Sequence, residues 1–281
     1  MTLPAPASVP DRATGVADRP GEGVNVAVAG IPDPAAVTAT EDGYTGPSAG
    51  TLGRLAAAAD AVDAAGGVLH APVPDFTAAG PWLVVEPLDG RLATVAKGTG
   101  TVTVTLSAPT GHLDARLRGL RDRVDAVFEA ARPTHDRYPV DRDEFGAFTP
   151  GLTTTEPAAV TVEEDGVTVT LDVATTPATT AAAIRQQFEA PAAVQDVAVT
   201  IDQGVERATP PPALRDAAEA AVAETLGDWA YEWLPGPSLF TQVPGGQKLA
   251  VGTGHPGADT YSHEAYRQLR AILTATMEAW G

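Results

Sequence analysis

Residues 160–173 read VTVEEDGVTVTLDV, and this stretch decides the fold of the middle of the chain. Valine or leucine alternates with small or polar residues on both sides of Glu164-Asp165-Gly166. Such alternation is typical of half-buried strands, and Asp-Gly between two alternating runs is a strong hairpin signal. We therefore predict an antiparallel hairpin with an exposed acidic tip.

The flanking residues complete a domain around this hairpin. Thr99–Ser107 alternates as a strand does, and Leu113–Ala131 has the spacing of an amphipathic helix. The apolar face of this helix would carry Leu117, Leu120, Val124 and Val127. Thr179–Glu189 predicts a second helix, and Val194–Ile201 predicts a last strand. The order β-α-β-β-α-β is the ferredoxin-like arrangement, so we predict an α+β domain over residues 99–202.

Residues on both sides of this domain have α/β character. Val24–Gly30 predicts a buried strand, Thr51–Ala65 a helix that stops at Gly66-Gly67, and Trp82–Val85 another strand. After the domain, helices are predicted at Ala213–Leu226 and Ser262–Trp280. The simplest account is an α/β core in two segments, 23–98 and 203–281, that an inserted domain interrupts. Residues 1–22 lack periodicity and predict a flexible N-terminal arm.

The composition is strongly acidic. Asp and Glu total 36 against 18 Lys and Arg, which gives a net charge of −18, and Lys97 and Lys248 are the only lysines. This pattern resembles that of haloarchaeal cytoplasmic proteins, and the alternative is an ordinary acidic protein from a GC-rich genome. We expect a cytoplasmic, halophilic protein that salt protects from self-repulsion.

Several classes of function are disfavoured. There is no basic patch for nucleic acid, and no apolar run is long enough to span a membrane. The start of the chain has no secretory signal pattern. Cysteine is absent, which excludes disulfides and thiolate metal sites.

Several short motifs occur in the order known from one enzyme family. They are Asp42–Ala49 (DGYTGPSA) before the first helix, Val84–Pro87 (VVEP) before the insert, Gly111-His112 and Leu171–Val173 (LDV) inside it, and His255–Glu264 before the last helix. Together with the interrupted core, they resemble the M20 metallopeptidases, the family of aminoacylases and deacetylases. The resemblance implies a zinc-peptidase-like α/β core with a ferredoxin-like lid and dimerisation domain. It also implies hydrolysis of amides by two bridged zinc ions and a glutamate base.

Most of the family's metal ligands have no match in this chain. Glu86 matches the ligand that precedes proline. The family's His-x-Asp pair falls on Gly30–Asp33, its bridging aspartate on Gly50, and its late histidine on Thr260. The paired glutamates, including the general base, fall on Phe76-Thr77.

Other site residues are carried over in the same way. The resemblance makes His112 the histidine that steadies the oxyanion across a dimer, whereas Ala174 replaces the family's arginine. His112 could instead be a relic that caps the following helix, and Glu86 a solvated carboxylate at a strand end. Weaker metal candidates are Asp75, Asp259 and His263, which could form a rebuilt mononuclear site with His70 and His255.

Two hypotheses follow. The first is a catalytically inactive M20 homologue without a cofactor. It would bind a small amino-acid-like ligand between the domains, or serve as an assembly partner, with the insert as the surface of a homodimer. The second is a residual zinc-dependent amidohydrolase acting on an N-acyl amino acid or a small peptide. Its ligands would be recruited from Asp33, Asp75, Glu86, Asp259 and His263.

Overall fold

The computed structural model divides into two compact units. The first comprises residues 1–96, 207–234 and 238–281, and the second is built from Lys97–Glu206. The residues that the structure describes are 3–17, 23–30, 32–70, 77–131, 153–163, 166–175, 180–189, 193–234, 238–255 and 257–281.

The first unit is built on a mainly parallel sheet with the strand order β11-β6-β13-β5-β1-β4, and β12 pairs with β6 beside this path. The strands are β1 (Asn25–Val28), β4 (Val68–His70), β5 (Trp82–Val85), β6 (Arg91–Ala96), β11 (Glu206–Arg207), β12 (Tyr231–Leu234) and β13 (Lys248–Gly252). β1, β4, β5 and β13 run parallel, whereas β6 is antiparallel to β13. The carboxyl ends of β5 and β13 therefore meet at one edge, where α/β proteins commonly place functional residues.

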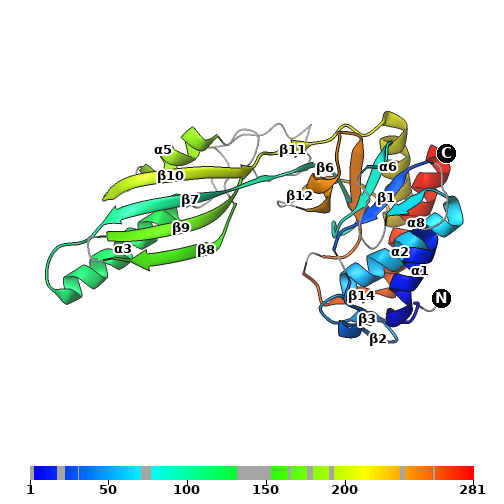
Figure 1. The fold of residues 1–281 in the computed structure, drawn as a ribbon, viewed down its shortest axis with the longest axis horizontal. Helices are drawn as coiled ribbons and strands as arrows, with labels where there is room; N and C mark the ends of the chain where they lie inside the picture. The colour runs from blue at the N-terminus through cyan, green and yellow to red at the C-terminus, as the bar shows by residue number, and fades with distance from the viewer. Residues whose placement is uncertain are drawn as a thin grey trace. The chain divides into compact units, whose positions relative to one another are not determined.

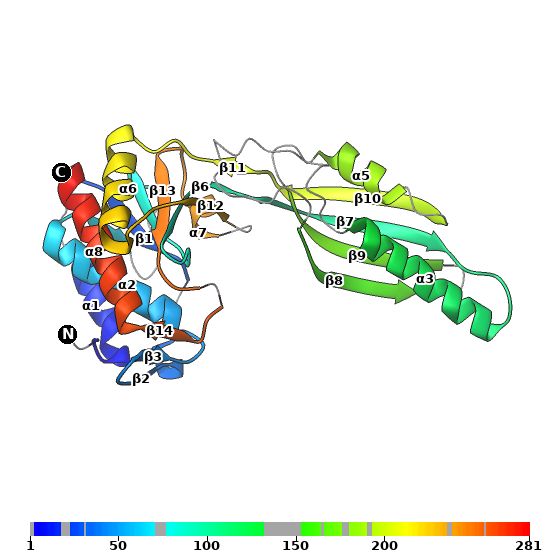
Figure 2. The same ribbon diagram turned by 180° about the vertical axis from the view of Figure 1, so that it is seen from behind.

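Helices cover this sheet, and a small sheet with the order β14-β3-β2 lies in the same unit. Its strands are β2 (Thr38–Ala39), β3 (Gly43–Thr45) and β14 (Thr260–Ser262). The helical segments are η1 (Pro6–Ser8), α1 (Val9–Ala17), η2 (Pro34–Ala36), α2 (Ala49–Ala65), α6 (Pro212–Leu226), α7 (Leu239–Gln242) and α8 (His263–Trp280). Helices α2, α6 and α8 gather on one side of the large sheet (Figures 1 and 2), where they bury the main hydrophobic core.

The N-terminal residues differ from the prediction of a flexible arm. Val9–Ala17 is a helix whose Val9, Ala13 and Val16 are buried. These positions follow the i, i+4, i+7 spacing of an amphipathic helix, which the Pro- and Asp-rich composition obscures. Arg12 forms an ion pair with the buried Asp60 of α2, and this pair attaches α1 to the core.

The second unit contains a four-stranded antiparallel sheet in the order β10-β7-β9-β8. Its described elements are, in chain order, β7 (Gly98–Ser107), α3 (Leu113–Ala131), β8 (Thr153–Val162), β9 (Gly166–Thr175), α5 (Ala181–Glu189) and β10 (Val194–Gln203). β8 and β9 form the predicted hairpin, although its tip at 164–165 lies outside the described residues. The observed order of strands and helices agrees with the prediction from periodicity.

Alternation along β7 places Val102, Val104 and Leu106 in the core of the second unit. Helix α3 meets this core through its second half, where Val127 is fully buried. The prediction that Leu117 lies on the buried face is wrong, because its side chain is 56% exposed. The first half of α3 thus extends beyond the apolar surface of the sheet. In the described part of the chain, no helix has the length and hydropathy needed to cross a membrane.

Candidate functional site

Glu86, the metal ligand that the motif predicts, has a different partner in the structure. It directly follows β5 and is only 4% exposed. Its Oε1 accepts a hydrogen bond of 3.1 Å from the backbone N–H of Phe240, in the first turn of α7. Burial raises the pKa of Glu86, while hydrogen bonds from Phe240, Ser238 and Leu239 and the charge of Arg54 act in the opposite direction. Glu86 therefore accepts a hydrogen bond in the first turn of a short helix whose N-cap is Ser238.

Lys248 occupies the other end of α7. Its side chain is fully buried, and its Nζ donates a hydrogen bond of 2.6 Å to the carbonyl of Val243, the C-cap of α7. The same ammonium group lies 4.7 Å from the centre of the Phe240 ring. The Glu86 and Lys248 side chains thus bond to backbone groups at the two ends of the helix, which an isolated helix would leave without partners. The pair thus fixes a helix of four residues that could not form alone.

Arg54 adds a second buried cation near Glu86. It projects from α2, is 6% exposed, and its Nη2 donates to Thr51 Oγ1 at 3.4 Å. A Cβ atom at position 50 would lie 3.2 Å from Arg54 Nη1, so the glycine at this position makes room for the guanidinium. Burial lowers the pKa of Arg54, and the nearby Tyr261 and Glu86 act in the opposite direction. Among the described residues, Arg54 Nε has no hydrogen-bond partner.

Among the described residues, the other predicted ligands have surroundings of their own. Asp33 is exposed, and its Oδ1 accepts from Ala35 N to cap η2. Asp259 is exposed. His263 begins α8, and its backbone N–H donates to the carbonyl of Asp42. Asp75 and Phe76 lie outside the described residues.

The histidines also have separate surroundings. His70 is buried, with its Nε2 2.9 Å from Asn25 Oδ1 and its ring 4.6 Å from that of Trp82. His255 is exposed and lies 3.5 Å from the Asp89 carboxylate. His112 is exposed in the second unit, where its backbone carbonyl accepts from the first turn of α3. The histidine is thus at the helix start that the capping alternative named, where its carbonyl accepts the first backbone bonds of the helix.

The described donor set does not fit a metal centre. Metal sites need several imidazole or carboxylate groups within coordination distance of one point. Within the ranges that the structure describes, no three His, Asp or Glu side chains are grouped in this way.

The turn between β3 and α2 reads GPSAG, which matches the Gly-x-Ser-x-Gly pattern of serine hydrolases around Ser48. A nucleophilic serine needs an adjacent base. Ser48 Oγ instead accepts a hydrogen bond of 3.2 Å from the backbone N–H of Asp33, and no described histidine side chain bonds to it. In the described part of the chain, Ser48 thus lacks the adjacent base that a nucleophile needs.

Comparison with known proteins identifies the fold. No protein-family profile matches the sequence, and no curated protein does. Solved structures do match. An aminopeptidase PepT from Bacillus cereus is 10% identical, with a TM-score of 0.57 over 97% of this chain and 91% of that one. The M20 family metallo-carboxypeptidase Sso-CP2 from Sulfolobus solfataricus is also 10% identical, with a TM-score of 0.52 over 92% of this chain and 85% of that one. This chain has an M20-like fold.

A further match supports the M20-like assignment. A tripeptidase from Staphylococcus aureus is 12% identical, with a TM-score of 0.54 over 92% of this chain and 80% of that one. The resemblance predicted from the motifs is confirmed for the fold. At this level of identity the likeness concerns the fold alone, so the activity has to be argued from the residues.

Proposed function

We propose that this protein is an M20 peptidase-like homologue without peptidase activity, which retains a role in ligand binding or assembly. The observation that carries the proposal is the environment of Glu86. Its carboxyl group accepts a hydrogen bond from α7, and the buried guanidinium of Arg54 lies near enough to influence its pKa. The guanidinium of Arg54 would thus occupy the place where M20 peptidases hold metal ions. It adjoins Gly50, the position of the family's bridging aspartate.

The proposal extends to the setting of the protein. We propose that it is cytoplasmic and adapted to high salt, because acidic residues outnumber basic ones by 36 to 18. Salt would screen the repulsion that this imbalance produces.

The test of inactivity is a metal and activity assay. We expect the purified protein, kept in molar KCl, to hold no stoichiometric zinc and to turn over none of a panel of N-acyl amino acids and small peptides. The reason is that Glu86 is the only residue that matches its motif among the family's ligands, and it already accepts a hydrogen bond from Phe240. The control is the same assay after dialysis against excess zinc.

The opposite result would support a residual amidohydrolase. The proposal would be refuted if the protein held about two zinc ions per chain and hydrolysed a substrate of the panel. That hydrolysis would have to be abolished by a chelator and by Glu86→Gln. Glutamine keeps the shape of the side chain and can still accept from Phe240, so a folded but inactive Glu86→Gln variant would identify Glu86 as a ligand.

The assembly role is proposed for the second unit, which we interpret as a ferredoxin-like dimerisation domain. Of the six large hydrophobic side chains that are exposed in the described part, five belong to this unit: Leu113, Leu117, Val160, Val162 and Ile201. β8 is an edge strand with unpaired backbone groups on one side. On β8 this edge carries the exposed Val160 and Val162, which fits a second copy of the chain.

We therefore expect light scattering after gel filtration in molar KCl to give twice the chain mass of 28.7 kDa. Val162→Glu should shift the protein to the monomer, because it would bury a charge in the interface. Trp229→Glu is the matched control, since Trp229 is 45% exposed but lies in the first unit. A monomeric wild type, or a dimer that survives Val162→Glu, would contradict this part of the proposal.

A further inference from the structure

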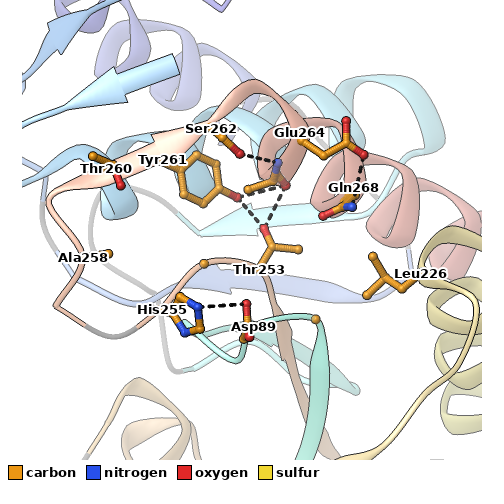
Figure 3. A pocket seen from close by; sticks show the side chains of 13 residues that line it. Asp89, Leu226, Thr253, His255, Ala258, Thr260, Tyr261, Ser262, Glu264 and Gln268 are labelled. Atoms are coloured by element: carbon orange, nitrogen blue, oxygen red, sulfur yellow. Dashed lines mark hydrogen bonds and ion pairs between the residues drawn. The ribbon is translucent and has the colours of Figure 1, made fainter. Parts of the chain in front are cut away.

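A pocket of about 300 Å³ lies in the first unit where β13 ends and α8 begins (Figure 3). The turn at Asp89-Gly90 and the C-terminal residue of α6, Leu226, form two of its sides. Arg54 and Phe240, which surround Glu86, do not line it, whereas Thr260, on which the family's late histidine falls, does. The pocket thus adjoins one position of the site that the resemblance predicts.

A network of hydroxyl groups makes the floor of this pocket rigid. Thr253 Oγ1 donates to the carbonyl of Ala265 at 2.8 Å, and Tyr261 OH lies 2.7 Å from Thr253 Oγ1 (Figure 3). Thr253 and Tyr261 are buried, and burial raises the pKa of Tyr261 to about 12. Both hydroxyls remain protonated and hydrogen-bonded, so the floor is formed before any ligand arrives.

The charge of the pocket is negative. Asp89 and Glu264 bring two carboxylates to it, whereas no described lysine or arginine lines it. His255 faces Asp89 at 3.5 Å and is charged only when protonated. Gln268 Nε2 donates to Glu264 Oε1 at 3.1 Å, and Arg267, which does not line the pocket, pairs with the same carboxylate. A ligand with a free carboxylate would be repelled here, and a cation would be attracted.

Size and apolar surface narrow the class of ligand. A volume of this size is at the lower end of small-molecule sites, which span about 300–1,000 Å³. Leu226, Ala258 and Ala265 supply apolar surface beside the two acids. We infer that the pocket binds a small organic ammonium ion with a short apolar body and no free carboxylate, such as an amino acid amide. This inference rests on the proposed binding role and names the chemistry of its ligand.

The test uses leucinamide as the probe. Isothermal titration with the full chain should show saturable binding of leucinamide. N-acetyl-leucinamide, which lacks the ammonium group, and leucine, which has a free carboxylate, should each bind at least about tenfold more weakly. Raising KCl should weaken leucinamide binding, because the two acids are on the exposed rim of the pocket.

Variants locate the binding. The double variant Asp89→Asn/Glu264→Gln should weaken leucinamide binding at least about tenfold, which corresponds to about 1.4 kcal/mol. Asp11→Asn/Glu41→Gln is the matched control: it changes the net charge equally at two exposed residues outside the pocket, and its affinity should equal that of the wild type.

Three results would overturn the inference: no binding of leucinamide, equal binding of N-acetyl-leucinamide, or equal losses in the two double variants. The metal and activity assay is run on the same preparation. Turnover of an N-acyl amino acid would refute the proposed inactivity without touching the pocket, whereas failure of leucinamide binding would refute the pocket alone.

Discussion

Replacing Glu86 by alanine is expected to lower the free energy of unfolding by about 3 kcal/mol. The carboxylate is buried, and its removal would leave the N–H of Phe240 without its acceptor. It would also leave the buried Arg54 without the negative charge nearby. Chemical denaturation at a fixed KCl concentration measures the effect.

Glutamine at position 86 is the informative comparison. Its carbonyl can still accept from Phe240, so we expect Glu86→Gln to stay within about 1 kcal/mol of the wild type at neutral pH. A loss as large as that of Glu86→Ala would mean that the charge, and not the hydrogen bond, holds α7.

The pH dependence has a definite sign. Burial raises the pKa of Glu86 above its value in the unfolded chain, so the folded protein binds this proton more tightly. The contribution of this proton to the free energy of unfolding is therefore present at low pH. It is lost as the pH rises through the pKa of Glu86 in the folded state. The stability of the wild type relative to Glu86→Gln should therefore be greatest in acid and fall with rising pH. The opposite trend would show that the ionised form is preferred.

The same residue shows what the sequence can and cannot predict. The motif locates Glu86 at the end of a strand, and the structure places it there. The motif cannot reveal that the carboxylate bonds to a backbone group 154 residues later. Contacts of this kind depend on the packing of α7 against the sheet, which no local periodicity encodes.

Arg54 and Lys248 were missed for a related reason. Each is a single charged residue, Arg54 within an alanine-rich helix and Lys248 at the start of a buried strand. Long cationic residues are almost never fully buried unless they are paired. The only available signal was the scarcity of lysine, because Lys248 is one of just two lysines in this acidic chain.

Regular patterns were more informative. The alternation in β7, β8 and β9 and the amphipathic spacing of α3 predicted the elements of the second unit, because one face of each element is buried. Short edge elements such as β11 and β12 carry little pattern and were not predicted. The Arg12–Asp60 ion pair, which joins α1 to α2, also has no local signature.

Gly53→Ala is expected to destabilise the protein by about 2–3 kcal/mol, although alanine is the better helix former. Gly53 lies within α2 against the ring of Tyr261, and a Cβ atom there would be 2.0 Å from Tyr261 Cδ1. The gain in helix propensity is only about 1 kcal/mol. Gly15→Ala in α1 is the control: a Cβ atom there meets nothing within 4 Å, so this variant should gain up to about 1 kcal/mol.

The ring of Tyr261 has little freedom to relieve this contact. Its backbone pairs with Tyr44 in the small sheet, and its hydroxyl bonds to Thr253. On the opposite side, a Cβ atom at Gly254 would lie 3.2 Å from the ring. If the ring causes the loss, Tyr261→Leu should cost less in the Gly53→Ala background than in the wild type, with a coupling of about 1 kcal/mol or more. Additive losses would instead attribute the effect of Gly53→Ala to the helix itself.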